Sequence, residues 1–169
     1  MCTIYRLYRC ANTLYRWRVP FLPKVIFYVM RFGFGTVVPY TALIGRNTMF
    51  QWDGLGIVIH HRAVVGENCD IGHGVTIGGR SGYDQVPVLG DYVVVGAGAK
   101  ILGPVKIGDY AVIGPNAVVI HDVPAYGVAA GVPARMSDQP PAEFLWLDQR
   151  LRPARKKNEH SHVELHYHT

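Results

Sequence analysis

The chain has 169 residues, of which 49% are hydrophobic and 17% are charged, and its formal net charge is +5 at pH 7. This length and composition are typical of one compact soluble domain, and no apolar run is long enough to span a bilayer. The positive charge lies at the two ends, where it favours an anionic membrane or an acidic ligand; no nucleic-acid-binding motif accompanies it, so nucleic acid is not expected as a partner.

Residues 3–33 predict two helices joined near Pro20, with Pro23 in the first turn of the second helix. A rough apolar stripe is interleaved with arginine and lysine, and aromatic residues are frequent. Such a segment suits a membrane interface, with the cations toward the lipid headgroups. The preferred interpretation is a helical cap that packs on the first coil or on neighbouring subunits, and the two roles are compatible. Residues 1–35 are therefore expected to be a helical cap or a membrane-contacting segment.

The first residues are charged and aromatic, unlike a secretory signal. The cysteines Cys2, Cys10 and Cys69 are odd in number and lack the spacing of metal ligands. These features favour a reducing compartment and hence a cytoplasmic protein. Contact of residues 3–33 with lipid would place it peripherally at the inner face of the cell membrane.

An aliphatic or aromatic residue returns at every sixth position through most of residues 38–119, and glycine often follows it. A small or β-branched residue stands four places later. A period of six is neither helical nor simple strand alternation, and it indicates the hexapeptide repeat of a parallel β-helix. The repeating positions are Val38, Ile44, Phe50, Ile59, Val65, Ile71, Ile77, Leu89, Val95, Ile101, Ile107, Ile113 and Val119.

The period also predicts how the coils stack. Each hexad makes one short strand and a corner, and three hexads close one triangular coil. Residues eighteen apart are then expected to stack one strand spacing apart, about 4.8 Å. The repeating aliphatic residues point inward, and Cys69, at a small inward position, is expected to be buried. The β-helix domain is expected over residues 36–136.

Two breaks interrupt the six-residue repeat. Phe50 and Ile59 are separated by nine positions, and Ile77 and Leu89 by twelve. The second break keeps the phase and is interpreted as an external loop over one coil. Long loops on a rigid scaffold often carry function, although a tolerated insertion is the alternative.

Residues 137–169 are expected to form a C-terminal extension. Residues 142–151 suit a short helix, and the tail becomes basic and then histidine-rich, with His160, His162, His166 and His168. Alternating histidines can bind metal, but disorder is the preferred interpretation of a charged terminal tail.

Several segments now carry a family resemblance: GIVIHHRAVVGENCDIGHGVTIGG, GAGAKILG, IGPNAVV and AAGVPAR. They resemble the serine acetyltransferase branch of the hexapeptide-repeat acyltransferases. They resemble more closely the short serine-acetyltransferase-like enzymes of bacterial polysaccharide clusters, which also open with a basic aromatic helical segment. The implied fold class is all-β: a left-handed parallel β-helix with a short N-terminal helical segment. The implied assembly is a homotrimer with active sites in clefts between subunits.

The resemblance further implies direct transfer of an acetyl group from acetyl-CoA as co-substrate. The pantetheine and nucleotide are expected to run past corners of small residues, where the thioester chain can approach backbone amides. Arg135 is expected to meet a phosphate, unless it is an ordinary surface arginine. The expected cofactor-binding residues are Gly78, Gly79, Ala97, Gly98, Pro115, Gly131 and Arg135.

The catalytic residues of that family are not matched. Its Asp ahead of the first coil has no counterpart in FGTVVP, its general-base His falls on Trp52 or Asp53, and its loop His falls on Val86. His73 is the preferred base, unless it is structural. It stands at a corner, and stacking of Ile71 on Phe50 is expected to place it about 5 Å, one strand spacing, from Trp52.

Other residues are weaker candidates for the base. His60 and His61 follow the first break, and Asp53 is a weak base, an orienting group or a turn residue. His121 is expected to have no role, and no metal site is expected.

Three functions remain open. The first is an O-acetyltransferase whose acceptor is a sugar of a surface polysaccharide or its precursor, which the short chain and the basic aromatic N-terminus favour. The second is a serine or amino-sugar acetyltransferase with the same chemistry. The third is a catalytically degenerate CoA-binding trimeric scaffold.

Overall fold

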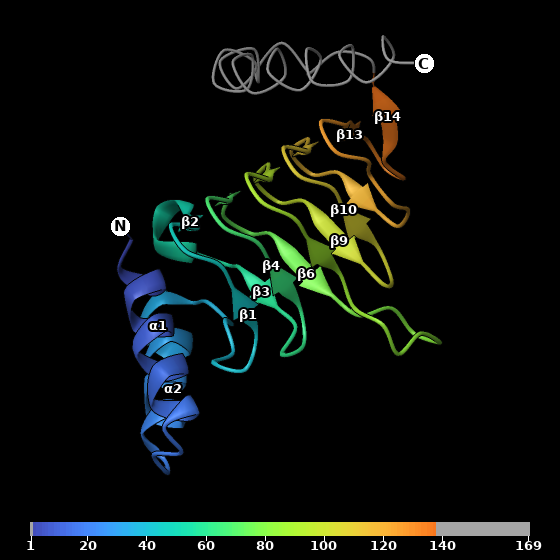
Figure 1. The fold of residues 1–169 in the computed structure, drawn as a ribbon. Coiled ribbons are helices and arrows are strands. Elements are labelled where there is room, and N and C mark those ends of the chain that lie inside the picture. The colour runs from blue at the N-terminus through green and yellow to red at the C-terminus, as the bar shows by residue number, and fades with distance from the viewer. Residues whose placement is uncertain (1, 138–169) are drawn as a thin grey trace, which may run out of the picture. The chain divides into compact units, whose positions relative to one another are not determined.

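The computed structural model describes residues 2–137, in which a pair of helices precedes a stack of short strands (Figure 1). Helix α1 spans Thr3–Arg16 and helix α2 spans Leu22–Phe34. The strands are β1 (Leu43–Ile44), β2 (Met49–Phe50), β3 (Val58–Ile59), β4 (Val64–Val65), β5 (Asp70–Ile71), β6 (Thr76–Gly78), β7 (Val88–Leu89), β8 (Val94–Val95), β9 (Lys100–Leu102), β10 (Lys106–Ile107), β11 (Val112–Ile113), β12 (Val118–Val119), β13 (Val128–Ala130) and β14 (Arg135–Ser137).

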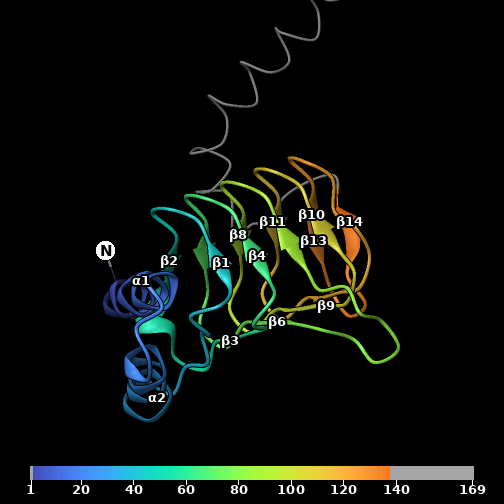
Figure 2. The same cartoon turned by 60° about the horizontal axis from the view of Figure 1, so that its bottom comes forward.

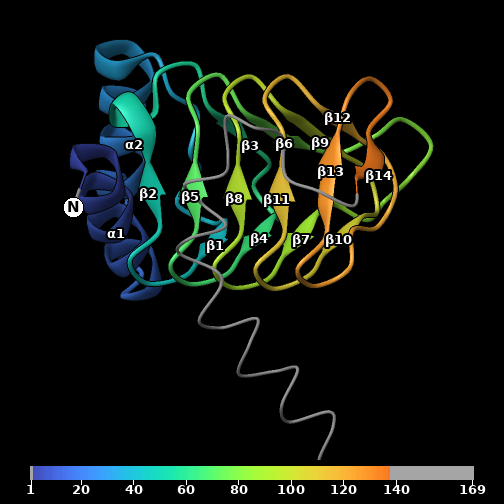
Figure 3. The ribbon, with the colours of Figure 1, turned by 90° about the horizontal axis from the view of Figure 1, so that it is seen from above.

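The strands form three parallel sheets that share one set of coils. Their orders are β1-β4-β7-β10, β2-β5-β8-β11-β13-β14 and β3-β6-β9-β12. Figure 3 shows β2, β5, β8, β11 and β13 side by side along one face. The chain therefore visits each sheet once per coil, and the prediction of a parallel β-helix behind a short helical segment is confirmed.

The register follows the six-residue period wherever the period is unbroken. Ile101 pairs with Val119, eighteen residues later, and Val95 with Ile113. Across the breaks the spacing grows by the inserted residues: Phe50 pairs with Ile71. Strand β14 pairs with β13 in the antiparallel sense and ends the parallel stacking of that sheet.

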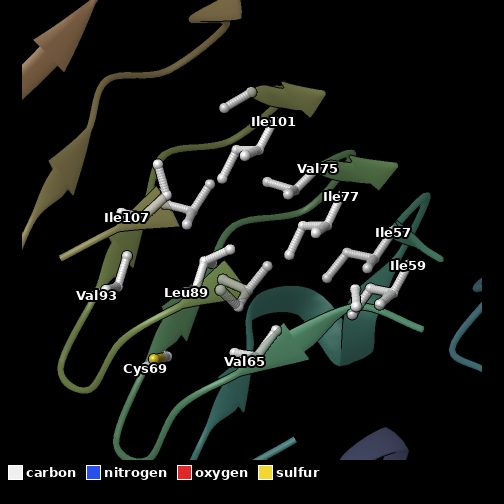
Figure 4. Close-up of a cluster of buried hydrophobic side chains, with 14 of the residues drawn as sticks. Ile57, Ile59, Val65, Cys69, Val75, Ile77, Leu89, Val93, Ile101 and Ile107 are labelled. Carbon is white, nitrogen blue, oxygen red and sulfur yellow. The ribbon is translucent and has the colours of Figure 1, made fainter. Parts of the chain in front are cut away.

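The core is a column of aliphatic side chains inside the coils (Figure 4). Every repeating position named above is buried, none more than 5% exposed. The small residues four places later fill the remaining interior. Cys69, one of them, is 1% exposed, as expected from its place in the hexad.

Helix α1 lies across the first coil at one end of the stack (Figure 2). It buries Ile4, Tyr5, Tyr8 and Ala11, which lie on one face of the helix. The Tyr5 hydroxyl donates to the Gly45 carbonyl at 2.8 Å, and the Asn12 side-chain amide donates to the Tyr40 carbonyl at 2.7 Å. The helical pair and the coils belong to one compact unit. Within residues 2–137, neither helix is both long and apolar enough to cross a membrane.

The two breaks in the six-residue repeat have different structures. The first inserts Trp52, Asp53 and Gly54 as part of a 3-10 turn. The second, residues 79–87, is an exposed loop that projects from the coils between β6 and β7 (Figure 1). The Arg80 guanidinium lies 5.5 Å from the centre of the Tyr83 ring in this loop.

Candidate active site

One edge of the β-helix carries His73 and most of the expected cofactor-binding residues. At this edge the chain leaves the β2–β14 sheet and enters the β3–β12 sheet. The equivalent residues of successive coils are Leu55, His73, Ala97 and Pro115, which we call the His73 edge. Backbone hydrogen bonds of 2.8 Å join them: Gly74 N–H to the Leu55 carbonyl, Gly98 N–H to the His73 carbonyl and Asn116 N–H to the Ala97 carbonyl.

Small residues just after these corners leave little side-chain volume along the His73 edge. Gly98 has a φ of 73°, and a Cβ there would collide with Asn116 Oδ1. Gly131 extends the edge, because its carbonyl accepts from the Val118 N–H at 3.0 Å. The edge therefore presents small residues and backbone groups, beside which the His73 imidazole is exposed.

Lys100 adds a positive charge next to His73. Its ammonium donates to the Gly74 carbonyl at 2.7 Å, and Gly74 directly follows His73 in the chain. Strand β9 points Lys100 outward because its neighbour Ile101 fills the core. The sequence reasoning missed Lys100, since a lysine at an outward strand position carries no signal of its own.

His60 and His61 lie at a different edge, where the β3–β12 sheet gives way to the β1–β10 sheet. We call this the His60 edge; it also holds loop 79–87. The two imidazole centres are 4.3 Å apart. Since three hexads complete a coil and Ile59 and Ile71 are two hexads apart, His61 and His73 occupy different edges of one chain.

His60 is held in a defined state. Its Nδ1 accepts a hydrogen bond from the Arg62 N–H at 3.2 Å. Partial burial lowers the pKa of His60 below its usual value, with further lowering from the neighbouring His61 and Arg62 charges. With Nδ1 accepting this hydrogen bond, a neutral ring carries its proton on Nε2, which is then a hydrogen-bond donor.

Asp53 has a structural partner. Its Oδ1 accepts a hydrogen bond from the Thr3 N–H, the first of helix α1, at 2.9 Å. Cys2, at the N-cap position, makes no side-chain capping bond, so Asp53 serves as the cap from fifty residues away. The first break in the repeat therefore anchors the helical pair to the coils.

The expected neighbour of His73 is not the one found. Strict stacking from Phe50 predicts Trp52 beside His73, but the chain leaves the coil after Gln51 and rejoins it at Leu55. The inserted Trp52 and Asp53 have φ values of 52° and 48°, and Trp52 is 78% exposed. Leu55 is therefore the residue in register beneath His73.

The remaining expected cofactor residues are divided between the edges. Ala97, Gly98, Pro115 and Gly131 follow the His73 edge. Gly78 and Gly79 stand at the end of β6, toward the His60 edge, where the Gly78 carbonyl accepts from Gly103 N–H at 3.0 Å. Arg135 lies in β14, opposite Ala130, and is exposed.

A groove of about 420 Å³ lies beneath loop 79–87. The Arg62 guanidinium spans it and donates to the Asp84 carbonyl at 2.5 Å. Lys106 lines the same groove, which is otherwise mostly apolar, with Val86, Val88 and Pro104 among its walls. The loop is thus tied to the coil below it, and two cations face the space between them.

Within residues 2–137, no group of three or more histidine, cysteine or acidic side chains is arranged to hold a metal ion. Burial raises the pKa of the Cys69 thiol to about 11, so this thiol is not a nucleophile at neutral pH. The histidine-rich tail and the helix expected at residues 142–151 lie outside the described residues.

The fold and the repeat define the chain as a hexapeptide-repeat transferase: residues 87–121 match the family model for the bacterial transferase hexapeptide (six repeats). A serine acetyltransferase of Helicobacter pylori strain J99 is 40% identical over 130 residues, which cover 76% of this chain and 75% of that protein. A serine acetyltransferase of Synechocystis is 44% identical over 132 residues, 77% of this chain and 53% of that protein. The chain belongs to the serine acetyltransferase family.

Solved structures of serine acetyltransferases are similar to this chain as well. Soybean serine acetyltransferase complexed with serine superposes with a TM-score of 0.74 at 37% identity, over 79% of this chain and 56% of that one. A serine acetyltransferase in complex with CoA gives a TM-score of 0.73 at 36% identity, over 79% and 55%. The chain spans about half the length of the first curated relatives, 53% in the case of the Synechococcus elongatus enzyme.

These similarities correct the expected acceptor. The short chain and the basic aromatic N-terminus had favoured a sugar of a surface polysaccharide. The relatives found are serine acetyltransferases at 34–44% identity, and the polysaccharide assignment is wrong.

Proposed function

We propose that this protein transfers an acetyl group from acetyl-CoA to the hydroxyl of serine or of a closely similar small amino acid. The observation that carries the proposal is the 40% identity across three quarters of a serine acetyltransferase. The exposed imidazole of His73, beside an edge of small residues, supports it independently, because acyl transfer needs a base next to a site open to backbone groups.

Acetyl-CoA is proposed to lie along the His73 edge. Ala97, Gly98, Pro115 and Gly131 leave room there for the pantetheine chain, and backbone amides are the partners its own amides need. Arg135, exposed in β14 at the far end of the stack, is proposed to meet a phosphate of the nucleotide.

A homotrimer is proposed because the candidate residues of one chain are split between two edges. When the His73 edge of one protomer faces the His60 edge of the next, one cleft contains both sets. His60, His61, Gly78 and Gly79 then stand across from His73 without any change within a chain. This arrangement also places the groove beneath loop 79–87 beside the cleft.

The proposed reaction is direct. The His73 imidazole accepts the proton of the acceptor hydroxyl as its oxygen attacks the thioester carbonyl. Backbone N–H groups, with His60 Nε2–H as a further donor, stabilise the oxyanion. The tetrahedral intermediate then expels the CoA thiolate, which takes the proton from His73. The products are the acetyl ester and CoA with a free thiol.

His61 is the alternative base, since His60 has its Nδ1 engaged by Arg62. Asp53 is the weakest candidate, because one of its carboxylate oxygens already caps helix α1. The resemblance puts the family's general-base position on Trp52 or Asp53, so the proposal assigns the proton to a histidine from another part of the coil.

The test measures serine-dependent release of CoA, with chromatography as the assay. The proteins compared are the wild type, His73→Ala, His61→Ala and the matched control His121→Ala. The proposal predicts turnover that falls by about 10²–10⁴-fold in His73→Ala and is unchanged in His121→Ala. Binding of acetyl-CoA without turnover of any hydroxy amino acid would contradict it and identify a CoA-binding scaffold. If only His61→Ala lost turnover, the general base would be His61, at the His60 edge, and not His73.

A further inference from the structure

We infer that the N-terminal helical pair docks the protein on an anionic lipid bilayer, with helix α2 lying in the interface. This goes beyond acetyl transfer, because it concerns a face of the molecule at the end of the stack, formed by α2 and the turn before it. The inference rests on the exposed side chains of α2, on the charge of the first 52 residues and on a cationic hollow at the turn between the helices.

The outer face of α2 is apolar, and its side chains are about half exposed or more. Leu22, Val25, Val29 and Phe32 recur at intervals of three and four, which places them on one face of a helix, and Phe32 is 79% exposed. The opposite face packs inward through Pro23 and Met30. Tyr28 on α2 is also exposed, and the end of α1 with the turn before α2 exposes Tyr15, Trp17 and Phe21.

This apolar face stands in a cationic environment. Residues 1–52 contain no aspartate or glutamate, and their seven basic side chains are all exposed: Arg6, Arg9, Arg16, Arg18, Lys24, Arg31 and Arg46. Lys24 and Arg31 stand seven residues apart, two helical turns, and flank the apolar face on one side. Cations that border an inserted apolar face are the pattern of a helix that binds anionic lipid.

The turn between the helices adds a headgroup-sized hollow. It measures about 620 Å³ and is lined by three cations, Arg16, Arg18 and Lys24, together with aromatic residues that include Tyr15 and Phe21. Phe21 is 82% exposed. Three positive charges directly beside an exposed aromatic ring match a phosphate group that is attached to an acyl chain.

A protein partner fits this surface less well. A second copy that packed the same face against itself would partly desolvate Lys24 and Arg31 at its border, and residues 1–52 contain no carboxylate to pair with them. Protein interfaces also exclude charge from their centre. A bilayer has no such conflict, since it offers acyl chains to the apolar residues and phosphates to the cations.

The helix length fixes the orientation. Helix α2 has 13 residues, which is about 20 Å at 1.5 Å per residue, and the hydrocarbon core is about 30 Å thick. Helix α2 therefore lies along the membrane surface, and the coils project from it into the aqueous phase.

The test is flotation of the full chain with vesicles of phosphatidylcholine, with and without phosphatidylglycerol. We expect binding to the anionic vesicles that weakens with salt. The double variant Phe21→Ser/Phe32→Ser is expected to bind at least tenfold more weakly. Lys24→Gln/Arg31→Gln is expected to lose about fivefold for each charge removed. Exposed residues elsewhere provide matched controls, Leu43→Ser in the first coil and Arg80→Gln in loop 79–87, and both are expected to lose much less.

All these side chains are exposed, so the thermal unfolding of the variants is expected to match that of the wild type. No flotation with anionic vesicles, or equal flotation of all variants, would overturn the inference. Self-association that Phe21→Ser/Phe32→Ser abolishes, without any vesicle binding, would identify the face as a contact between copies of the chain. Acetyl transfer is measured in solution without vesicles, so a failure of the proposed acetyl transfer and a failure of membrane binding can be told apart.

Discussion

Single side chains of helix α1 tie the helical pair to the coils, and Tyr8 makes the most buried of these contacts. Its hydroxyl donates to the Ala42 carbonyl at 2.6 Å and accepts from the Ile44 N–H at 3.1 Å. The side chain is 2% exposed, and burial is the main cause that raises the pKa of its hydroxyl. Both hydrogen bonds are therefore buried.

Tyr8→Phe is therefore expected to lower the free energy of unfolding by about 1–3 kcal/mol, because it leaves a buried carbonyl and a buried N–H without a partner. Urea denaturation followed by circular dichroism measures the loss. Tyr83→Phe, in the exposed loop, is the control and is expected to change stability by less than about 0.5 kcal/mol. Equal stability of Tyr8→Phe and the wild type would show that the helix is not held in this way.

Cys69 should be protected from alkylation in the folded protein. Its thiol pKa of about 11 leaves roughly one part in a thousand as thiolate at pH 8, and its side chain is buried. Cys10 is exposed. Iodoacetamide followed by mass spectrometry is expected to modify Cys10 first and Cys69 only in denaturant; equal rates in the native protein would contradict the buried placement.

At the scale of elements, the hexapeptide period predicted the strands well because it reports inward-facing positions directly. Each repeating aliphatic residue is buried, and each unbroken interval gives an eighteen-residue register. The first break is different, because its three inserted residues leave the coil and two of them adopt left-handed backbone angles. Counting forward from Phe50 gives Trp52 beneath His73, whereas counting eighteen residues back from His73 gives Leu55. Hydrophobic periodicity alone does not tell on which side of the insertion the register continues.

The site was less predictable than the fold for a related reason. The assignments of Gly98 and Pro115 as cofactor-binding residues came from the family resemblance. To decide which residues share an edge of the β-helix, one must also count the hexads that separate them. His61 and His73 occupy the same phase of the hexad, so phase alone suggests equivalence. Only the two-hexad interval between them places them at different edges. Lys100 had no motif to mark it.

Helix α1 depends on a cap supplied by the first break. Asp53→Ala is expected to lower the free energy of unfolding by about 0.5–2 kcal/mol, since the Thr3 N–H loses its acceptor. Asp53→Asn keeps an oxygen acceptor and tolerates the left-handed backbone, so its stability is expected to be close to that of the wild type. Chemical denaturation measures both.

The same pair separates structure from chemistry at Asp53. If its carboxylate only caps the helix, Asp53→Asn retains turnover. A large loss of turnover in Asp53→Asn at unchanged stability would instead assign the carboxylate a part in proton transfer.

At the scale of the coils and the helical pair, the two proposed functions lie at separate places in the fold. The edges along the stack carry the histidines and the small residues proposed for acetyl transfer. The helical pair at one end presents an apolar and cationic face. Because each coil contacts mainly its neighbours, the end can bind a membrane without altering the edges, and the proposed catalytic cleft then faces the aqueous phase.

The most direct measurement is a crystal structure of the protein with CoA bound. We predict a homotrimer in which the pantetheine passes Ala97, Pro115 and Gly131, and in which the CoA thiol lies within hydrogen-bonding distance of the His73 imidazole. A monomer, or a CoA molecule whose thiol lies away from His73, would contradict the account.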